Sequence, residues 1–91
     1  MYLGRHCNKN DYLYLERISK EFLILINRDN YDIELTKSYL KAFSDFDFEI
    51  STKIRIYLDK LAVDKDKYLI KISNLLEELK TNVLVDIREH N

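Results

Sequence analysis

The sequence contains no proline and a single glycine, Gly4, among its 91 residues. β-Hairpins commonly place glycine, Asn-Gly or Asp-Gly at turn positions that need a positive φ, and neither dipeptide occurs here. Helix interiors need no such residues and are destabilised by both glycine and proline. The scarcity of the two residues therefore favours an all-α fold over a sheet of several strands.

Cysteine is just as scarce, since Cys7 is the single one in the chain. It cannot form an intrachain disulfide, and no further ligands follow it at the spacing of a metal site. His6 precedes it, but a Cys–His nucleophile needs the imidazole to approach the sulfur and a third group to orient it. Adjacent residues seldom meet that requirement, so we expect an ordinary thiol and a solvated imidazole. The lack of a disulfide framework also favours a cytoplasmic location.

Motifs for metal, phosphate or membrane binding are absent as well. Acidic runs begin at Asp45 and Asp64, but isoleucine or leucine stands where a calcium loop requires glycine and glutamate. One glycine excludes a glycine-rich phosphate loop, and Asp86 with His90 lacks the Glu-x-x-His partners of a di-iron bundle. No apolar run reaches the length of a membrane span, and no targeting segment opens the chain. We therefore expect a protein without metal, cofactor, membrane span or enzymatic activity.

The sequence does contain enough apolar residues for one small core. The apolar fraction is 46% and the charged fraction is 34%, which fits a single folded domain of this length. Residues 1–10 show no hydrophobic period, and we assign them to an irregular N-terminal arm. Residues 11–91 form a single helical domain in this interpretation.

Apolar residues recur at helical spacing in four segments of this domain. The spacing predicts a compact antiparallel bundle of about four helices, joined by loops of about two to five residues. The expected helices cover approximately residues 11–28, 31–44, 46–62 and 65–87. Polar residues near the starts of three helices are the expected caps: Asn10 or Asp11, Asp29 or Asn30, and Asp64.

The segment from Phe46 to Leu58 fits two periods. Every second residue is apolar along most of the segment, as in a half-buried strand. Taken at steps of three and four, the same segment gives an equally regular helical stripe. The α+β alternative to the bundle therefore has strands at 22–26, 46–58 and 83–87.

A longer pattern distinguishes the two interpretations. The helical stripe begins at Leu35 and continues to Leu61 without losing phase. Because a strand would not inherit the phase of the preceding helix, this continuity favours helix for 46–58. The S-x-x-D sequence that starts at Ser44 fits a capping box and predicts a new helix from Asp45.

The net charge is −1, from 15 basic and 16 acidic residues, and this balance argues against a general nucleic-acid-binding role. The acids nevertheless cluster around aromatic residues within 29–34 and 45–49, at helix N-termini that we expect at neighbouring corners. Phe48 falls off the helical stripe, so it is a candidate exposed aromatic anchor. The candidate partner-binding residues are Asp29, Tyr31, Asp32, Glu34, Asp45, Asp47, Phe48 and Glu49.

These features predict a small non-enzymatic module that binds a protein partner, basic at the contact, and acts by occupying it. Immunity proteins, antitoxins, inhibitors and phage-type regulators act in this way. One alternative is a nucleic-acid-binding regulator that uses the basic face of residues 53–71, and another is a self-associating structural protein or homodimer. The same acids could also serve only as helix caps and dipole partners.

Overall fold

The computed structural model of the protein describes residues 6–90, and these form four helices. No strand occurs in this part of the chain. The all-α prediction is therefore confirmed, and the alternative with strands at 22–26, 46–58 and 83–87 has no support. Of the predicted N-terminal arm, residues 1–5 lie outside the described residues. The helices are α1 (Lys9–Ile26), α2 (Ile33–Phe46), α3 (Phe48–Leu58) and α4 (Lys65–His90).

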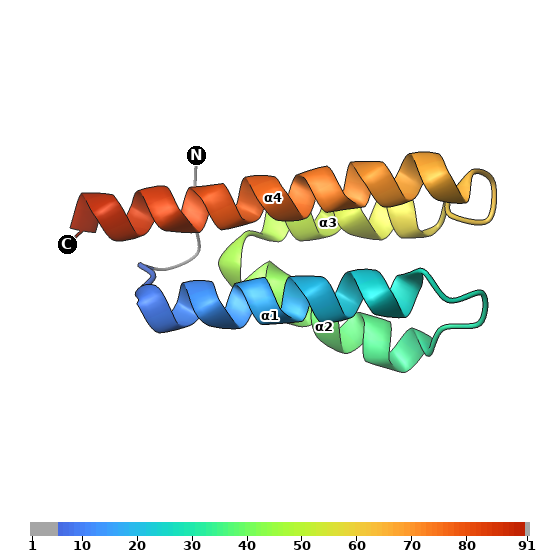
Figure 1. The fold of residues 1–91 in the computed structure, drawn as a ribbon, viewed down its shortest axis with the longest axis horizontal. Coiled ribbons are helices and arrows are strands. Elements are labelled where there is room, and N and C mark those ends of the chain that lie inside the picture. The colour runs from blue at the N-terminus through green and yellow to red at the C-terminus, as the bar shows by residue number, and fades with distance from the viewer. Residues whose placement is uncertain (1–5, 91) are drawn as a thin grey trace.

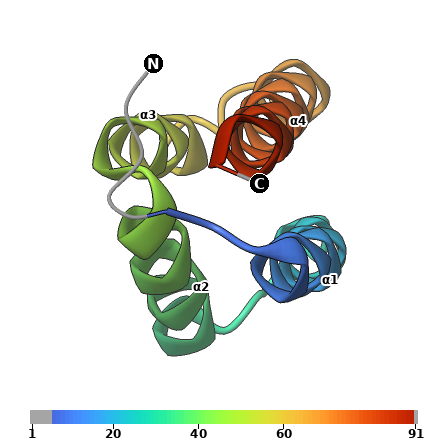
Figure 2. The ribbon, with the colours of Figure 1, turned by 90° about the vertical axis from the view of Figure 1, so that its left-hand side faces the viewer.

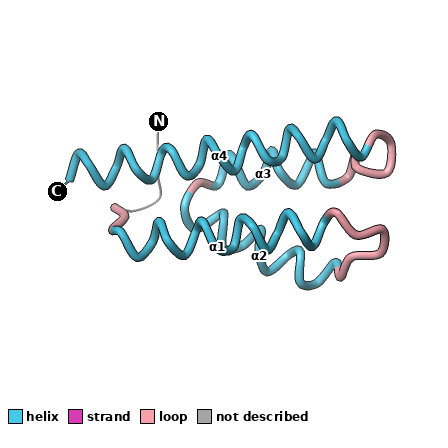
Figure 3. Tube along the Cα trace, viewed as in Figure 1, coloured by secondary structure: helices cyan, strands magenta, loops and turns pink. Residues whose placement is uncertain are grey.

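Each helix is antiparallel to the two neighbours that it contacts (Figures 1 and 2). The contacts join α1 to α2, α2 to α3, α3 to α4, and α4 back to α1. Figure 2 shows α1, α3 and α4 nearly end-on, with α2 inclined to them. The α1–α2 and α3–α4 loops lie together at one end of the bundle (Figure 3). The molecule measures 42 × 20 × 16 Å, and the predicted antiparallel bundle is confirmed.

The core is built from the apolar stripes that the helical spacing predicts. Helix α4 contributes four residues that are at most 1% exposed, which are Ile72, Leu76, Leu79 and Val83. The stripe of 35–61 is buried along most of its length, and its innermost residues are Phe43, Phe46, Ile50 and Ile54. Leu35 is the exception, because it lies in the first turn of α2 and is 44% exposed.

Helix α1 begins two residues earlier than predicted, because Asn8 caps it rather than Asn10 or Asp11. The Asn8 side chain accepts a hydrogen bond from the Asp11 backbone N–H at 3.0 Å. The Asp11 carboxylate in turn accepts one from the Asn8 N–H at 2.9 Å. This reciprocal pair satisfies two backbone donors at the start of the helix, so the expected arm is shorter than ten residues.

The break between α2 and α3 falls at Asp47, and the predicted start from the Ser44 capping box is wrong. Asp47 has an extended backbone, with φ −153° and ψ 106°, and its side chain accepts a hydrogen bond from the Ile50 N–H at 3.1 Å. Ser44 remains inside α2, which continues for two further residues and ends at Phe46, a core residue that is 1% exposed. The cap of α4 is Asp64, as predicted, and its Oδ1 accepts from the Lys67 N–H at 3.1 Å.

The residues just before α1 are held against α4. The backbone N–H of Cys7 donates to Oδ2 of Asp86 at 2.7 Å, and Nδ1 of His6 lies 3.6 Å from Oδ1 of the same carboxylate. Cys7 is 7% exposed and belongs to the core, whereas the His6 side chain is 76% exposed. The solvated imidazole is as expected, and Cys7 lies in the irregular segment before α1, but its side chain belongs to the core.

Candidate protein-binding surface

The α2–α3 corner, residues 45–49, presents two nearby aromatic side chains on opposite sides of the chain. Phe46 ends α2 and is 1% exposed, whereas Phe48 begins α3 and is 74% exposed. Asp47 lies between them with an extended backbone that ends one helix and starts the next, so the two rings belong to different helices. Phe48, which falls off the helical stripe, shares the exposed surface of α3 with Ile56, which is 50% exposed.

Carboxylates flank Phe48 on this corner. Asp45 and Glu49 are both exposed, and Glu49 lies 3.5 Å from Nζ of Lys53, one helical turn further on. An exposed ion pair of this kind contributes little to stability, so Glu49 can exchange it for a partner's charge at little cost. Asp47 differs from the other two acids, because it is half-buried and its side chain caps α3. Asp45 and Glu49 therefore carry the accessible negative charge of the corner.

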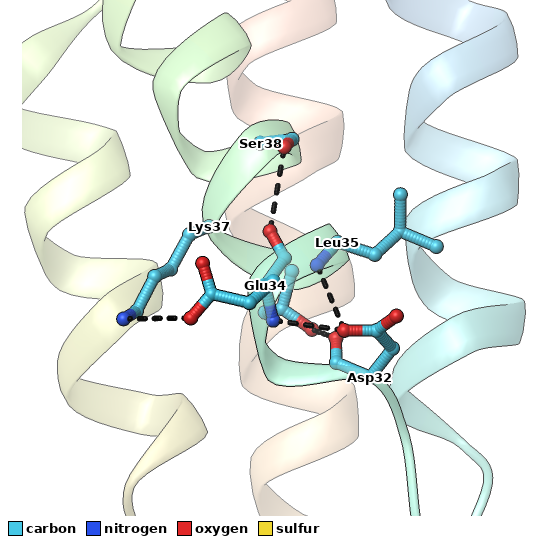
Figure 4. Close-up of polar contacts among 6 residues, drawn as sticks. Asp32, Glu34, Leu35, Lys37 and Ser38 are labelled. Carbon is cyan, nitrogen blue, oxygen red and sulfur yellow. Dashed lines mark hydrogen bonds and ion pairs between the residues drawn. The ribbon is translucent and has the colours of Figure 1, made fainter.

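The second acidic cluster, residues 29–34, lies at the start of α2. Asp32 caps this helix, so the expected cap at Asp29 or Asn30 is two or three residues too early. Figure 4 shows the cap, in which Oδ1 of Asp32 accepts from the N–H groups of Glu34 and Leu35 at 2.9 and 3.2 Å. The Asp32 side chain therefore satisfies backbone donors that the first turn leaves without partners.

The other members of the 29–34 cluster also make contacts within the chain. Asp29 lies 3.3 Å from Nζ of Lys65, which reaches it from the start of α4. The Glu34 carboxylate lies 3.4 Å from Nζ of Lys37 (Figure 4). Tyr31 is half-buried and packs against the core. The contacts of Asp29 and Tyr31 join the α1–α2 loop to the bundle, whereas the Glu34–Lys37 pair lies within α2 itself.

Helix α2 separates the two acidic clusters. Asp32 caps its first turn and Asp47 follows its last residue. A helix of this length, 14 residues, spans roughly 20 Å at a rise of about 1.5 Å per residue. Both clusters lie at helix N-termini as expected, but the expectation that they occupy neighbouring corners is wrong. The eight candidate residues form two separate surfaces, and the α2–α3 corner is the one with a fully presented aromatic ring.

An apolar groove that no sequence pattern indicated lies at the other end of α2. Two depressions, of about 360 and 270 Å³, meet at Tyr31, Ile33 and Leu58, which line both of them. We name the two together the Tyr31 groove. Ile33 is 64% exposed and lies at the start of α2, directly after the Asp32 cap. The groove was missed because residues from all four helices and from the α1–α2 and α3–α4 loops create it, and these residues form no continuous pattern in the sequence.

Four lysines of the 53–71 segment contact carboxylates or aromatic rings of the same chain. Lys53 and Lys65 pair with Glu49 and Asp29, as described above. Nζ of Lys67 lies 5.4 Å from the centroid of the Tyr68 ring, and Nζ of Lys71 lies 5.7 Å from that of Tyr57. Such cation–π contacts are weak at exposed sites. The nucleic-acid-binding alternative therefore stays a prediction that these contacts do not test.

One polar contact joins α1 to α2 through a half-buried side chain. The Tyr39 hydroxyl donates a hydrogen bond to Oε1 of Glu21 at 2.9 Å. Burial raises the pKa of Tyr39 above its usual value of 10.0, and the hydrogen bond and charge of Glu21 raise it further. The Tyr39 ring also packs edge-on against Phe22, with centroids 5.8 Å apart. The contact thus belongs to the packing of the bundle.

The part of the chain that the structure describes contains no group of three or more His, Cys, Asp or Glu side chains that could hold a metal ion. None of its helices is long and apolar enough to cross a membrane. No protein-family model matches the chain, and no curated protein or solved structure shows significant similarity to it. The function must therefore be inferred from the surfaces of the chain itself.

Proposed function

We propose that the protein is a small, non-enzymatic binding module that acts by occupying a partner protein through its α2–α3 corner. The observation that supports this proposal is the exposure of Phe48. The other three phenylalanines, Phe22, Phe43 and Phe46, are at most 1% exposed, whereas Phe48 is 74% exposed. A ring left in water adds nothing to the core, but it offers a partner a large apolar anchor.

The carboxylates beside the ring define the chemistry of the partner. Asp45 and Glu49 favour a surface that carries basic side chains around an apolar pocket for Phe48. In such complexes the charges speed encounter and select the orientation, while the buried ring supplies much of the affinity. Immunity proteins, antitoxins, inhibitors and phage-type regulators are the kinds of protein that act by occupying a partner in this way.

The test begins with a photo-crosslinking amino acid in place of Phe48, which would capture the partner in cells. Calorimetry with the purified partner then compares Phe48→Ala with a matched control, Ile70→Ala, whose parent side chain is 61% exposed on α4. Phe48→Ala is expected to weaken binding at least about 30-fold, as for an aromatic hot spot, and Ile70→Ala less than about threefold. The proposal fails if only the control variant weakens binding.

The charges are tested separately by replacing Asp45 and Glu49 with lysine. The double variant is expected to associate more slowly with a basic partner, and its association rate should lose most of its dependence on salt concentration. Asp47 is left unchanged, because its replacement would also remove the cap of α3. An unchanged association rate at low salt would contradict the assignment of the corner.

A further inference from the structure

The Tyr31 groove is a second surface with the features of a docking site. Its apolar floor includes Leu58 and Leu61, which are both 8% exposed, and Tyr31, which is half-buried. Ile33 forms an exposed apolar lip that lines both depressions. A concave apolar floor of this kind suits a large apolar side chain inserted from another molecule.

The rim of the groove carries more positive than negative charge. Arg28 lines the larger depression and Arg55 the smaller one, and both are exposed. Neither guanidinium forms an ion pair with a residue of the described part of the chain. Lys37 and Lys65 also line the groove, but they are already paired with carboxylates, and Asp59 contributes one negative charge. The unpaired cations therefore favour a ligand whose apolar anchor is accompanied by carboxylates.

The chain itself presents such a ligand. At the α2–α3 corner an exposed phenylalanine, Phe48, stands beside the exposed carboxylates of Asp45 and Glu49. We propose that the Tyr31 groove of one copy receives the α2–α3 corner of a second copy. Phe48 enters the apolar floor, and the two carboxylates meet Arg28 and Arg55, for which guanidinium–carboxylate pairing is well suited.

The position of the two surfaces determines the kind of assembly. The groove and the corner lie at opposite ends of α2, so each contact between them joins two different patches. Such a head-to-tail contact leaves one groove and one corner unoccupied at the ends of the assembly. Further copies can add there, which gives open chains, or the assembly closes into a ring, of which the smallest is a two-fold dimer with two such contacts.

Self-association of this kind does not depend on the proposed partner. It covers the corner of every copy except the terminal one, so it competes with partner binding and sets the concentration at which the corner is accessible. The two proposals can be separated, because changes in the groove affect self-association and leave the partner-binding corner intact.

Analytical ultracentrifugation of the full chain tests the proposal with three variants. The corner variant is Phe48→Ala, and the groove variant combines Arg28→Glu with Arg55→Glu. The control combines Lys9→Glu with Lys20→Glu, two exposed cations of α1 outside the groove. Each replacement of a basic residue with glutamate lowers the net charge by two. The groove variant and the control therefore both change the net charge from −1 to −5. Circular dichroism confirms that every variant remains folded.

The wild type and the control are expected to show an average mass that rises with concentration above that of a monomer, either to a closed dimer or to larger assemblies. Either the corner or the groove variant alone should associate at least about 30-fold more weakly. A mixture of the two restores one intact contact, so it should give one-to-one dimers and nothing larger. A wild type that stays monomeric up to about 1 mM, or a mixture that does not form dimers, overturns the proposal.

Discussion

Two buried serines allow the packing of the bundle to be tested. The same substitution, serine to alanine, is expected to stabilise the fold at one position and to destabilise it at the other. Ser19 lies in α1 and is 1% exposed, and its hydroxyl has no hydrogen-bond partner among the described residues. Ser51 lies in α3 and is 4% exposed, but its hydroxyl donates to the backbone oxygen of Leu40 in α2 at 2.9 Å. Replacing each serine with alanine therefore removes an unsatisfied group in one case and an interhelical hydrogen bond in the other.

The magnitudes follow from these environments. Leaving a buried hydroxyl unsatisfied costs about 1–3 kcal/mol, and alanine is better than serine inside a helix by about 0.5 kcal/mol. Ser19→Ala should therefore raise the free energy of unfolding by about 1.5 kcal/mol or more. Ser51→Ala loses a hydrogen bond worth about 1 kcal/mol and gains the same helix propensity, so it should lower that free energy by about 0.5 kcal/mol.

The difference in free energy of unfolding between the two variants is a more stringent test than either value alone, because the helix-propensity contribution is the same in both and cancels. Their free energies of unfolding should differ by about 2 kcal/mol, which separates the melting temperatures by roughly 8–16 °C in a domain of this size. Urea denaturation followed by circular dichroism provides the free energies, and a thermal scan provides the Tm values. If Ser19→Ala melts no higher than Ser51→Ala, the assignment of the Ser19 hydroxyl as unsatisfied is refuted.

Three further predictions concern individual polar groups. Asp47→Ala should lower the free energy of unfolding by about 1 kcal/mol through loss of the α3 cap. The control Asp45→Ala, at an exposed site, should change it by less than about 0.5 kcal/mol. Equal effects of the two substitutions in urea denaturation would contradict the role of the cap. Because burial raises the pKa of Tyr39, its stabilising contribution is complete below pH 10 and is lost as the pH rises from 10 through the raised pKa. Stability measured across this range should fall more steeply for the wild type than for Tyr39→Phe, and parallel curves would refute this. Asp86→Ala should increase the hydrogen-exchange rate of the Cys7 amide, which NMR can measure, whereas Asp86→Asn keeps an acceptor and should retain much of the protection.

The sequence predicted the helical core because periodicity is a property of neighbouring residues. The steps from Phe43 to Phe46, Ile50 and Ile54 are spaced for one helix face, and all four side chains are buried. The same reasoning identified Phe48 as a residue that this face could not include, and it is 74% exposed. The candidate corner could therefore be found from the sequence, although its partner could not.

The helix boundaries could be predicted only approximately, since several residues offered equivalent caps. Asn8, Asn10 and Asp11 can all cap a helix, and the choice of Asn8 depends on Asp11 returning the second hydrogen bond. At the α2–α3 break, local chemistry favoured Ser44, whereas α2 continues for two more residues and ends at the buried Phe46. In both cases a contact that the local pattern does not specify decides between similar candidates.

The Tyr31 groove and the contact of Cys7 with Asp86 could not be predicted from the sequence at all. Tyr31 and Leu58 meet only after the turn at Asp47 has folded α3 back along α2, which brings the end of α3 beside the α1–α2 loop. Cys7 and Asp86 are 79 positions apart, and no periodic pattern relates residues at that separation. Surfaces that depend on the relative placement of several helices emerge only with the complete tertiary structure.

The same Cys7–Asp86 hydrogen bond implies an order of events while the chain is being synthesised. Helix α1 is complete once residue 26 has been added, but Asp86 of α4, the helix that covers one side of α1, is added only 60 residues later. At about 5–20 residues per second, this interval lasts roughly 3–12 s. During that time the apolar face of α1 that later meets α4 is open to chaperones on the ribosome, and the residues around Cys7 reach their native position last.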